Sequence, residues 1–460
     1  PPTCFGDLSE ACRRGFSPDP LNQNNPRGGM LRLKLHWQIA IAIALALGAG
    51  IGTGVMPDDS AARGLLSGTY EFVGDLFVNA LKMLIVPLIT SSIIVGVAGM
   101  GKGSAIGRLG ARTLLFYATT GLAAILVGLI LVNIFQPGIY NGEPAKQLLA
   151  LEASTEDVEQ RVGGRDASDI VEIFIRMIPP NIISAAANGE MLGLIFFSLL
   201  FGYFMTRLDD AYAGTLYRFW EAVFEVMMRM TDLIMRFAPI GVFGLIAGVI
   251  ASLDFSEVRD FLTILSKYAL IVAGALAIHT FLTLPAFLRY IARVRPAAMF
   301  NGTAPALLTA FSTASSSATL PVTMECVEDN IGVSKKTASF VLPLGATVNM
   351  NGTALYECVA AMFIAQAYGL EITLGVQFII VLTALVTSIG VAGVPQASLV
   401  AIAIILQTIG LPLEAIGVLF VFDRVLDMAR TAVNVFGDAC CATIIARLEG
   451  EETKIAIERT

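Results

Sequence analysis

Long apolar segments alternate with short polar connections along most of this chain. A helix needs about 20 mostly apolar residues to cross the hydrocarbon core of a membrane. The first part of the sequence therefore predicts membrane-spanning helices at residues 37–56, 72–98, 113–136, 189–206, 222–251 and 262–291. Several of these segments are longer than a bilayer requires, so we expect them to tilt or to protrude.

After residue 296 the apolar segments contain Ser, Thr, Gly, Pro and Asn where a simple span would remain apolar. Residues 297–366 and 370–446 share one organisation: an apolar segment interrupted by small residues, then a long helix with polar residues midway. The first interruption is FSTASSSATLP at 311–321, and the second is TSIGVAGVPQASL at 387–399. This pattern is typical of inverted repeats whose broken helices meet near the middle of the membrane.

Composition agrees with an integral membrane protein. Of the 460 residues, 55% are apolar and only 15% are charged, against about 25% charged residues in ordinary soluble proteins. A net charge of −7 offers no basic surface for nucleic acid. The two histidines, His36 and His279, lie far apart, and the six cysteines form no CxxC pair. The spacing of the histidines and cysteines predicts neither a zinc site nor a catalytic dyad, so we do not expect an enzyme.

Basic residues indicate the orientation of the spans. If the N-terminus is cytoplasmic, they fall on one side, whereas the loops at 137–167 and 252–261 are acidic or mixed. We therefore expect a multi-pass protein of the inner (plasma) membrane with both termini cytoplasmic. Residues 1–29 are polar and precede Met30; we expect an added or wrongly assigned start with little structure, the alternative being a native disordered tail.

The last predicted helix carries charge at membrane depth. Asp423, Asp427, Arg430, Asn434 and Asp438 recur at spacings that place them on one stripe of a helix. Charges at this depth cost about 3 kcal/mol each on insertion scales. Asp427 could bind the ammonium group of an acidic amino acid, Arg430 could bind its distal carboxylate, and Asp438 could hold a hard cation. The alternative is an internal ion pair that only stabilises the fold.

The helix before the second interruption offers another cation site. The motif NMNGT at 349–353 predicts a break, near which Gly345, Thr347 and Asn349 could present oxygen atoms to Na⁺. Glu357 lies further along among apolar residues. Burial favours the neutral form of a carboxyl group, so Glu357 could carry a proton; the alternative is an exposed Glu at a helix end.

Three serines, Ser315, Ser316 and Ser317, occupy the first interruption. Their hydroxyl groups and a short helix N-terminus suit an anion, whereas the alternative role is close helix packing by small residues. An intramembrane hydrolase would need a His or Lys base beside them, and none is legible. An anion channel also fits two re-entrant segments, but the charged stripe favours a closed binding site.

With these motifs and LKMLIVPLITSSIIVG at 81–96, residues 35–447 resemble the glutamate transporter family of dicarboxylate/amino acid:cation symporters, which includes excitatory amino acid and archaeal aspartate transporters. The resemblance implies an all-α membrane protein with eight transmembrane helices, two re-entrant hairpins and an elevator mechanism in a homotrimer. Residues 30–296 would form mainly the scaffold, with spans three and six contributing to the transport domain. Residues 297–446 would form the transport core and 447–460 a cytoplasmic tail.

The resemblance also implies a substrate site for L-glutamate or L-aspartate, with a C4-dicarboxylate such as succinate or malate as the alternative. Ser316 and the surrounding backbone would bind the α-carboxylate, Asp427 and Thr431 the amino group, and Arg430 the distal carboxylate. The second tip would close the site from outside. The residues implied are Ala314, Ser315, Ser316, Ser317, Thr353, Gly393, Val394, Pro395, Asp427, Arg430, Thr431 and Asn434.

For the coupled ions, Na⁺ and/or H⁺, the resemblance implies two sodium sites and no organic cofactor. One site would use Gly345, Asn349, Asn434 and Asp438, and the other Thr347, Met350, Ser388, Ile389 and Val391. A third, at Tyr117, Thr120 and Asn351, would be weak or absent, because Asn351 replaces the usual Asp and Gly121 offers no hydroxyl. Glu357 matches the acid linked to proton coupling in eukaryotic members.

One further departure concerns a second arginine. Ala314 and Met428 stand where other members of the family carry one, and Arg424 is nearby in the sequence. We expect Arg424 to face solvent or the scaffold rather than to take over that role.

Overall fold

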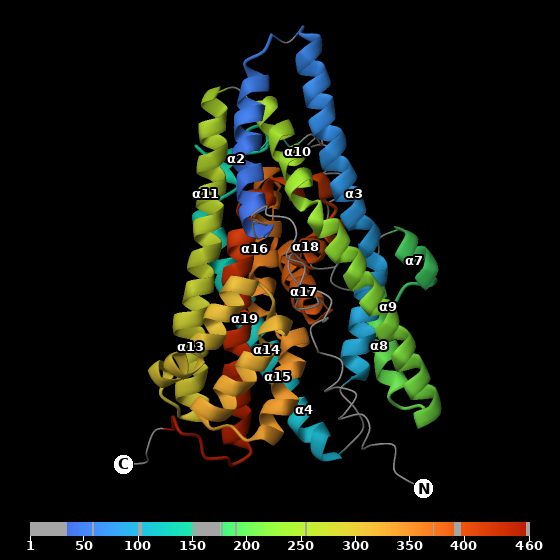
Figure 1. Cartoon of the computed structure of the whole chain (residues 1–460), viewed down its shortest axis with the longest axis vertical. Helices are drawn as coiled ribbons and strands as arrows, with labels where there is room; N and C mark the ends of the chain where they lie inside the picture. The colour runs from blue at the N-terminus through green and yellow to red at the C-terminus, as the bar shows by residue number, and fades with distance from the viewer. Residues whose placement is uncertain are drawn as a thin grey trace, which may run out of the picture.

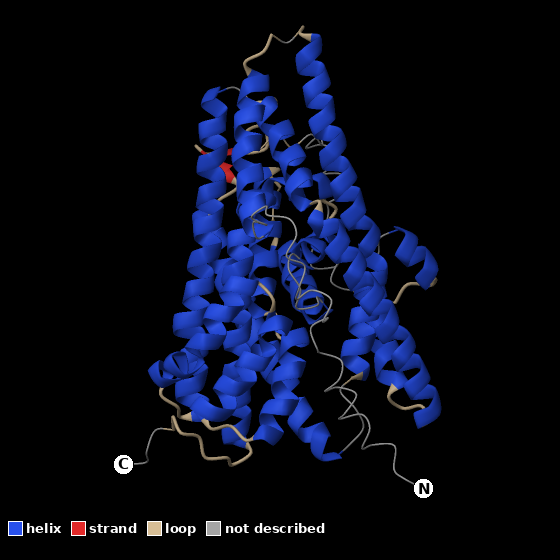
Figure 2. Ribbon diagram, viewed as in Figure 1, coloured by secondary structure: helices blue, strands red, loops and turns tan. Residues whose placement is uncertain are grey.

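The computed structural model describes residues 35–57, 59–99, 104–149, 151, 175, 178–188, 191–253, 255–370, 372–390 and 397–456. Within these residues the chain is almost entirely helical (Figure 2). The strands described there form one short antiparallel hairpin, β1 (Ile139–Tyr140) with β2 (Glu143–Pro144).

A first group of helices packs around α10. This helix contacts α2 and α3, and α3 also packs against α8 and α9 (Figure 1). Close approach depends on glycine: a side chain at Gly241 of α10 would clash with Phe77 of α3. The elements are α2 (Leu35–Gly54), α3 (Ala61–Ala98), α7 (Ile182–Asn188), α8 (Met191–Met205), α9 (Asp210–Arg236) and α10 (Ala238–Ala251).

A second group surrounds α16, whose residues are all buried. Both α4 and α11 pack against α16 and α19, so two early helices belong with the later half of the chain. The helices before the first hairpin are α4 (Ser104–Phe135), α11 (Phe255–Ile278), η2 (His279–Thr283), α12 (Leu284–Phe287) and η3 (Leu288–Ala292). Those that follow are α13 (Pro296–Thr313), α14 (Ser316–Glu325), η4 (Cys326–Ile331), α15 (Lys335–Val348), α16 (Asn351–Ala367), α17 (Leu374–Gly390), α18 (Ala397–Ile409), η5 (Leu413–Leu419) and α19 (Phe420–Leu448).

Most of the predicted spans are helices of membrane length. Among the described residues, α2, α3, α4 and the continuous helix Glu257–Ala292 are long and apolar enough to cross a bilayer, and α9 with α10 would be a fifth span, bent by 54°. The span predicted at 189–206 corresponds to α8, which has 15 residues. Its length of about 22 Å falls short of the hydrocarbon core of about 30 Å.

The predicted helix breaks are present. In the hairpin of α13 and α14 the chain turns at Ala314, whose φ of 51° is left-handed, and Ser315 caps α14 by accepting a hydrogen bond from the Ala318 amide at 3.2 Å. Helices α15 and α16 are separated at Asn349 and Met350. Of the second interruption, the structure describes the end of α17 at Gly390 and the start of α18 at Ala397, but not residues 391–396. Helix α19 runs unbroken for 29 residues.

The segment after α19 folds back over one end of the second group. Glu451 accepts hydrogen bonds from the Ser334 amide (2.9 Å) and hydroxyl (2.7 Å), at the start of α15, and from Thr337. Partial burial acts to raise the pKa of Glu451, but these hydrogen bonds lower it below its usual value. Arg112 of α4 forms an ion pair with Glu449. The basic segments of α4, α13, α15 and α19 therefore lie together, and we call this the basic end (Figure 1).

Candidate functional site

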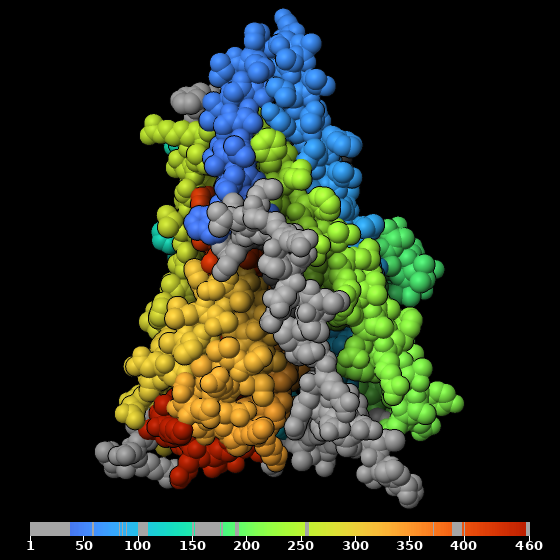
Figure 3. All heavy atoms as spheres, in the orientation of Figure 1, coloured from blue at the N-terminus to red at the C-terminus, as the bar shows by residue number. Residues whose placement is uncertain are grey.

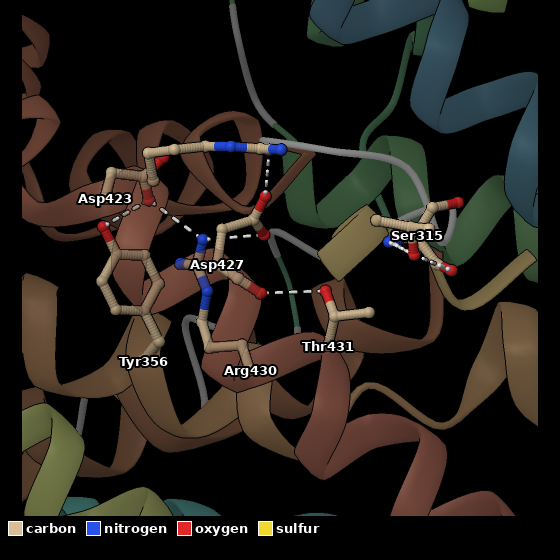
Figure 4. A network of polar contacts seen from close by, with 8 residues as sticks. Ser315, Tyr356, Asp423, Asp427, Arg430 and Thr431 are labelled. Carbon is tan, nitrogen blue, oxygen red and sulfur yellow. Dashed lines mark hydrogen bonds and ion pairs between the residues drawn. The ribbon is translucent and has the colours of Figure 1, made fainter. Parts of the chain in front are cut away.

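A buried charge cluster lies on α19. Nη2 of Arg430 donates to Oδ1 of Asp423 and to Oδ1 of Asp427, both at 3.0 Å. The guanidinium lies 3.8 Å from the ring centroid of Tyr356, whose hydroxyl donates to Oδ1 of Asp423 at 2.9 Å (Figure 4). The side chains of Arg430 and Asp423 are each 1% exposed. The cluster thus holds a guanidinium in a fixed orientation by two carboxylates and one aromatic face.

The guanidinium of Arg430 has further donors. Its Nε and Nη1 are buried and have no hydrogen-bond partner in the described part of the chain. Buried donors without partners are rare and costly in folded proteins. Nε and Nη1 point to different sides of the guanidinium, whose parallel donor pairs each include Nη2, so one ligand carboxylate would accept from only one of these two donors.

Arg424 contributes a second guanidinium to this cluster. Its Nη1 lies 3.4 Å from Oδ2 of Asp427, and its side chain is 12% exposed. The expectation that Arg424 faces solvent is therefore wrong, whereas the scaffold alternative stays a prediction. The long side chain of Arg424 reaches about one helical turn forward to Asp427, which supplies a mostly buried counter-charge. Asp427 consequently lies between two guanidinium groups.

Asn434 connects α19 to the break between α15 and α16. Its Nδ2 donates to Oγ1 of Thr353 (3.2 Å) and to the Met350 sulfur (3.3 Å), while its Oδ1 accepts from the Gly352 amide at 2.8 Å. A Cβ at Gly352 would lie 2.9 Å from the Arg430 carbonyl oxygen, so this position requires glycine. The break in one helix is thereby joined to the charged stripe of the other.

Further along α19, Asp438 is 3% exposed. Its Oδ1 accepts a hydrogen bond from Nδ2 of Asn349 at 2.8 Å, and within the described ranges no Lys or Arg forms an ion pair with it. A side chain at Gly345 would clash with this carboxylate. The structure therefore brings together Gly345, Asn349, Asn434 and Asp438. A buried carboxylate without a counter-charge attracts a cation.

The residues of the weak third sodium site also lie together. Nδ2 of Asn351 donates to Oγ1 of Thr120 at 3.1 Å, and Tyr117 donates to the Val341 carbonyl oxygen at 3.1 Å. A Cβ at Gly121 would lie 3.3 Å from Oδ1 of Asn351. An amide thus occupies this region and donates a hydrogen bond where a carboxylate would accept one.

The second sodium site is only partly described. Thr347 donates to the Leu344 carbonyl oxygen (3.0 Å), and Ser388 donates to the Leu385 carbonyl oxygen (2.9 Å). Helices α15 and α17 are in contact, and Met350 contacts Asn434 as given above. The side chain of Ile389 and all of Val391, Gly393, Val394 and Pro395 lie outside the described residues.

The first tip lies alongside α19. Both α13 and α14 pack against that helix, and Ser316 is 4% exposed. In Figure 4, Ser315 lies on the Thr431 side of the cluster. The hydroxyl of Thr431 donates to the Asp427 carbonyl oxygen at 2.9 Å. Ala314, Ser315, Ser316 and Ser317 thus supply the N-terminus of α14 near the helix that carries the charges.

Glu357 is fully buried on α16. Its Oε2 accepts a hydrogen bond from Thr387 of α17 at 2.9 Å, and its Oε1 has no partner in the described part of the chain. The alternative of an exposed Glu at a helix end is therefore wrong. Glu357 joins the helix after the break to the first arm of the second hairpin.

Two contributors were not assigned to the substrate site from the sequence. Asp423 was recognised as part of the stripe but given no role, and Tyr356 was missed. Tyr356 follows Thr353 by three residues and so shares its helix face; this spacing could have identified it. The hydrogen bond from Tyr356 to Asp423 explains why both are buried.

A multi-pass helical protein with a buried polar site between broken helices has the architecture of secondary transporters. The model of the sodium:dicarboxylate symporter family matches residues 35–448, and the chain belongs to this family of secondary transporters. It is 36% identical to the proton/glutamate-aspartate symporter of Escherichia coli (strain K12), over 82% of this chain and 84% of that protein. It is 35% identical to the proton/sodium-glutamate symport protein of Geobacillus stearothermophilus, covering 82% and 87%, and 34% identical to human excitatory amino acid transporter 3, covering 87% and 83%.

Proposed function

We propose that this protein is a secondary active symporter that moves L-glutamate or L-aspartate into the cell, coupled to Na⁺ and/or H⁺. The observation that carries the proposal is Arg430, buried beside Asp427 with two unpartnered donors. The names of the three relatives, all of which refer to glutamate or to excitatory amino acids, support an acidic amino acid as the substrate.

In this proposal each part of the substrate has its own partner. The distal carboxylate accepts a hydrogen bond from Nε or Nη1 of Arg430, and the ammonium group meets Asp427 and Thr431. The α-carboxylate lies at the first tip, where Ser316 and the neighbouring backbone supply donors. Asn434 and Thr353 complete the pocket, and Gly393, Val394 and Pro395 of the second tip close it.

The coupled cations are proposed to bind before the substrate. Sodium at Asp438, with the oxygen atoms of Gly345, Asn349 and Asn434, neutralises a carboxylate that has no cationic partner among the described residues. A second sodium uses Thr347, Met350, Ser388, Ile389 and Val391. The region of Tyr117, Thr120 and Asn351 binds sodium weakly or not at all. Glu357 carries the proton where H⁺ is coupled.

We further propose eight membrane helices with two re-entrant hairpins, arranged as a homotrimer in the inner membrane. The basic end faces the cytoplasm together with both termini, in keeping with the positive-inside rule. The first helix group is the scaffold, and the second group, including α4 and α11, moves as the transport domain. The packing of α4 and α11 against α16 and α19 supports this division.

A C4-dicarboxylate symporter is the second candidate. It is favoured by the position of Arg424, whose guanidinium lies beside Asp427. A dicarboxylate has two anions and no ammonium group, and Asp427 already has two guanidinium partners. Arg424 and Arg430 could then hold one carboxylate each. Competition by succinate against labelled aspartate distinguishes the two candidates, because only a dicarboxylate carrier binds succinate at least as tightly as aspartate.

The direct test is uptake of labelled aspartate by proteoliposomes under an imposed Na⁺ or H⁺ gradient. We expect accumulation above the external concentration with at least one of the gradients. Equilibration that ignores both gradients would overturn coupling, and concentrative uptake of succinate with no uptake of aspartate would establish the second candidate.

A further inference from the structure

A groove away from the charged site runs along α11. It has a volume of about 1250 Å³, and its walls come from α2, α4 and α11, including Ile51 and Leu131. It therefore lies at the border between the first and the second helix group. Nothing in the proposed transport chemistry uses these residues.

The dimensions of the groove suit an extended apolar ligand. Its volume exceeds the roughly 300–1,000 Å³ of ordinary small-molecule pockets. Along α11 the lining extends from Val258 to Ile278, about 30 Å of helix, and the apolar part after Lys267 is about 16 Å long. One half of a membrane's hydrocarbon core is about 15 Å thick. Leu270 and Phe135 remain 73% and 53% exposed at its walls. The part of the groove after Lys267 therefore matches the length of one acyl chain within one leaflet.

Positive charge borders the groove at one end. Arg259 and Lys267 both line it, and Nζ of Lys267 donates to the Gln136 carbonyl oxygen at 3.0 Å. No ion pair joins either residue to a carboxylate in the part of the chain that the structure describes. The nearby Asp260 instead accepts a hydrogen bond from Tyr140 at 2.9 Å. Two cations thus line the half of the apolar channel toward the start of α11, and the residues described as lining it include no carboxylate, which is complementary to a phosphate attached to an acyl chain.

We propose that this groove binds one anionic phospholipid. Its phosphate lies at Arg259 and Lys267, and one acyl chain runs along α11 past Gly274 toward Ile278. Because the walls belong to both helix groups, a bound lipid contacts both. Lipid occupancy then influences any movement of one group relative to the other, and this last consequence rests on the proposed transport mechanism.

Lipid binding is tested on the full-length protein by native mass spectrometry with phosphatidylglycerol and phosphatidylcholine. Two basic residues near an anionic headgroup should favour phosphatidylglycerol on the order of 30-fold. The double variant Arg259→Ala, Lys267→Ala should lose this preference, whereas the control Arg229→Ala, in an exposed ion pair on α9, should retain it. Equal binding of the two lipids by the unaltered protein would overturn the anionic assignment.

A second variant tests the position of the acyl chain. A side chain at Gly274 would meet no atom within 4 Å, so Gly274→Phe fills the groove without a clash and should abolish retention of the lipid. The control is Gly48→Phe on α2, which is equally open and outside the groove. Unchanged lipid retention in Gly274→Phe would overturn the assigned position of the acyl chain.

Dissociation of an oligomer by this variant would show that a second copy of the chain covers the groove, and would also overturn the proposal. Neither lipid preference nor lipid retention depends on transport, so failure of the lipid proposal can be distinguished from failure of the proposed transport function.

Discussion

The polar stripe of α19 changes character along its length. Toward the start of the helix, Asp423, Asp427 and Arg430 form a cluster in which each charge has a partner of opposite sign. Two turns after Arg430, Asp438 has an amide donor and no ion-pair partner among the described residues. The first region keeps its charges in place while leaving directional donors for a ligand, whereas the second has a charge left to neutralise. This difference separates a site for an organic anion from a site for a cation on a single helix. The red spheres at the basic end in Figure 3 belong to the end of the chain, after the buried stripe of this helix.

The largest effect is expected from Arg430→Thr. The change removes the guanidinium and leaves Asp423 and Asp427 buried without it, and breaking such a pair costs about 3–5 kcal/mol. Binding of aspartate should weaken by roughly 100-fold or more. Because the site then no longer selects a distal carboxylate, we expect it to accept Ser or Ala. Titration calorimetry of the purified variant measures its affinity for aspartate, Ser and Ala. Aspartate binding at normal affinity would show that Arg430 has no role in recognition, and Arg229→Thr on the surface is the control.

Asp438→Asn should reduce the response of the protein's melting temperature to sodium. Because the buried carboxylate lacks a cationic partner, replacing it with a neutral side chain of the same size should leave the sodium-free protein at least as stable. A bound cation raises the melting temperature of the folded state by mass action. We expect Na⁺ to raise the melting temperature of the variant less than that of the unaltered protein, because only the second sodium site remains. The matched control is Asp232→Asn on α9. An equal rise in melting temperature for the unaltered protein and for Asp438→Asn would show that the cation binds elsewhere.

Glu357→Gln should separate proton from sodium coupling. Glu357 is buried with one unpartnered oxygen, and glutamine keeps the shape while removing the titratable group. Uptake driven by a proton gradient should fall several-fold, whereas uptake driven by saturating sodium should persist. Thr387→Val, which removes only the hydrogen-bonding partner, is the control. A variant that responds to the proton gradient as the unaltered protein does would exclude Glu357 as the carrier.

Asn351→Asp should create a stronger sodium site beside Thr120. The substitution replaces a donor amide with an acceptor carboxylate, and the Thr120 hydroxyl lies 3.1 Å from it. Half-maximal uptake should require several-fold less sodium, because the added negative charge attracts the cation. The same charge change at the exposed Asn330 should have no such effect. An unchanged sodium requirement would show that this region does not bind sodium in either form.

The smallest effect is expected from Arg424→Met. Asp427 retains its shorter hydrogen bond to Arg430 at 3.0 Å, so aspartate affinity should change only about threefold, within the range of weakly exposed ion pairs. Competition by succinate should fall more than binding of aspartate if Arg424 holds a second carboxylate. Arg236→Met on α9 is the control. Equal effects on both ligands would limit Arg424 to positioning Asp427.

The apolar pattern of the sequence predicted most spans and the breaks at Ala314 and Asn349, because both depend on local residue types. It placed the start of α3 at residue 72, whereas the helix begins at Ala61; the added turns are less apolar, and helix packing rather than hydropathy determines them. The stripe of α19 was predicted from spacing alone. The direction of Arg424, the ring of Tyr356 beneath Arg430 and the contact of Glu357 with Thr387 depend on contacts between distant segments, which spacing on one helix cannot supply.

The central claim is that the two regions of α19 act together, one binding the acidic substrate and the other its coupled cation. Reciprocal linkage requires that each ligand tighten the binding of the other. The most direct measurement is the affinity of the purified protein for aspartate, titrated over a range of sodium concentrations and of pH. We predict that aspartate binding tightens at least tenfold as sodium or protons increase, and that Asp438→Asn weakens the sodium dependence to the contribution of the second sodium site. Aspartate affinity that is independent of both cations would contradict the account.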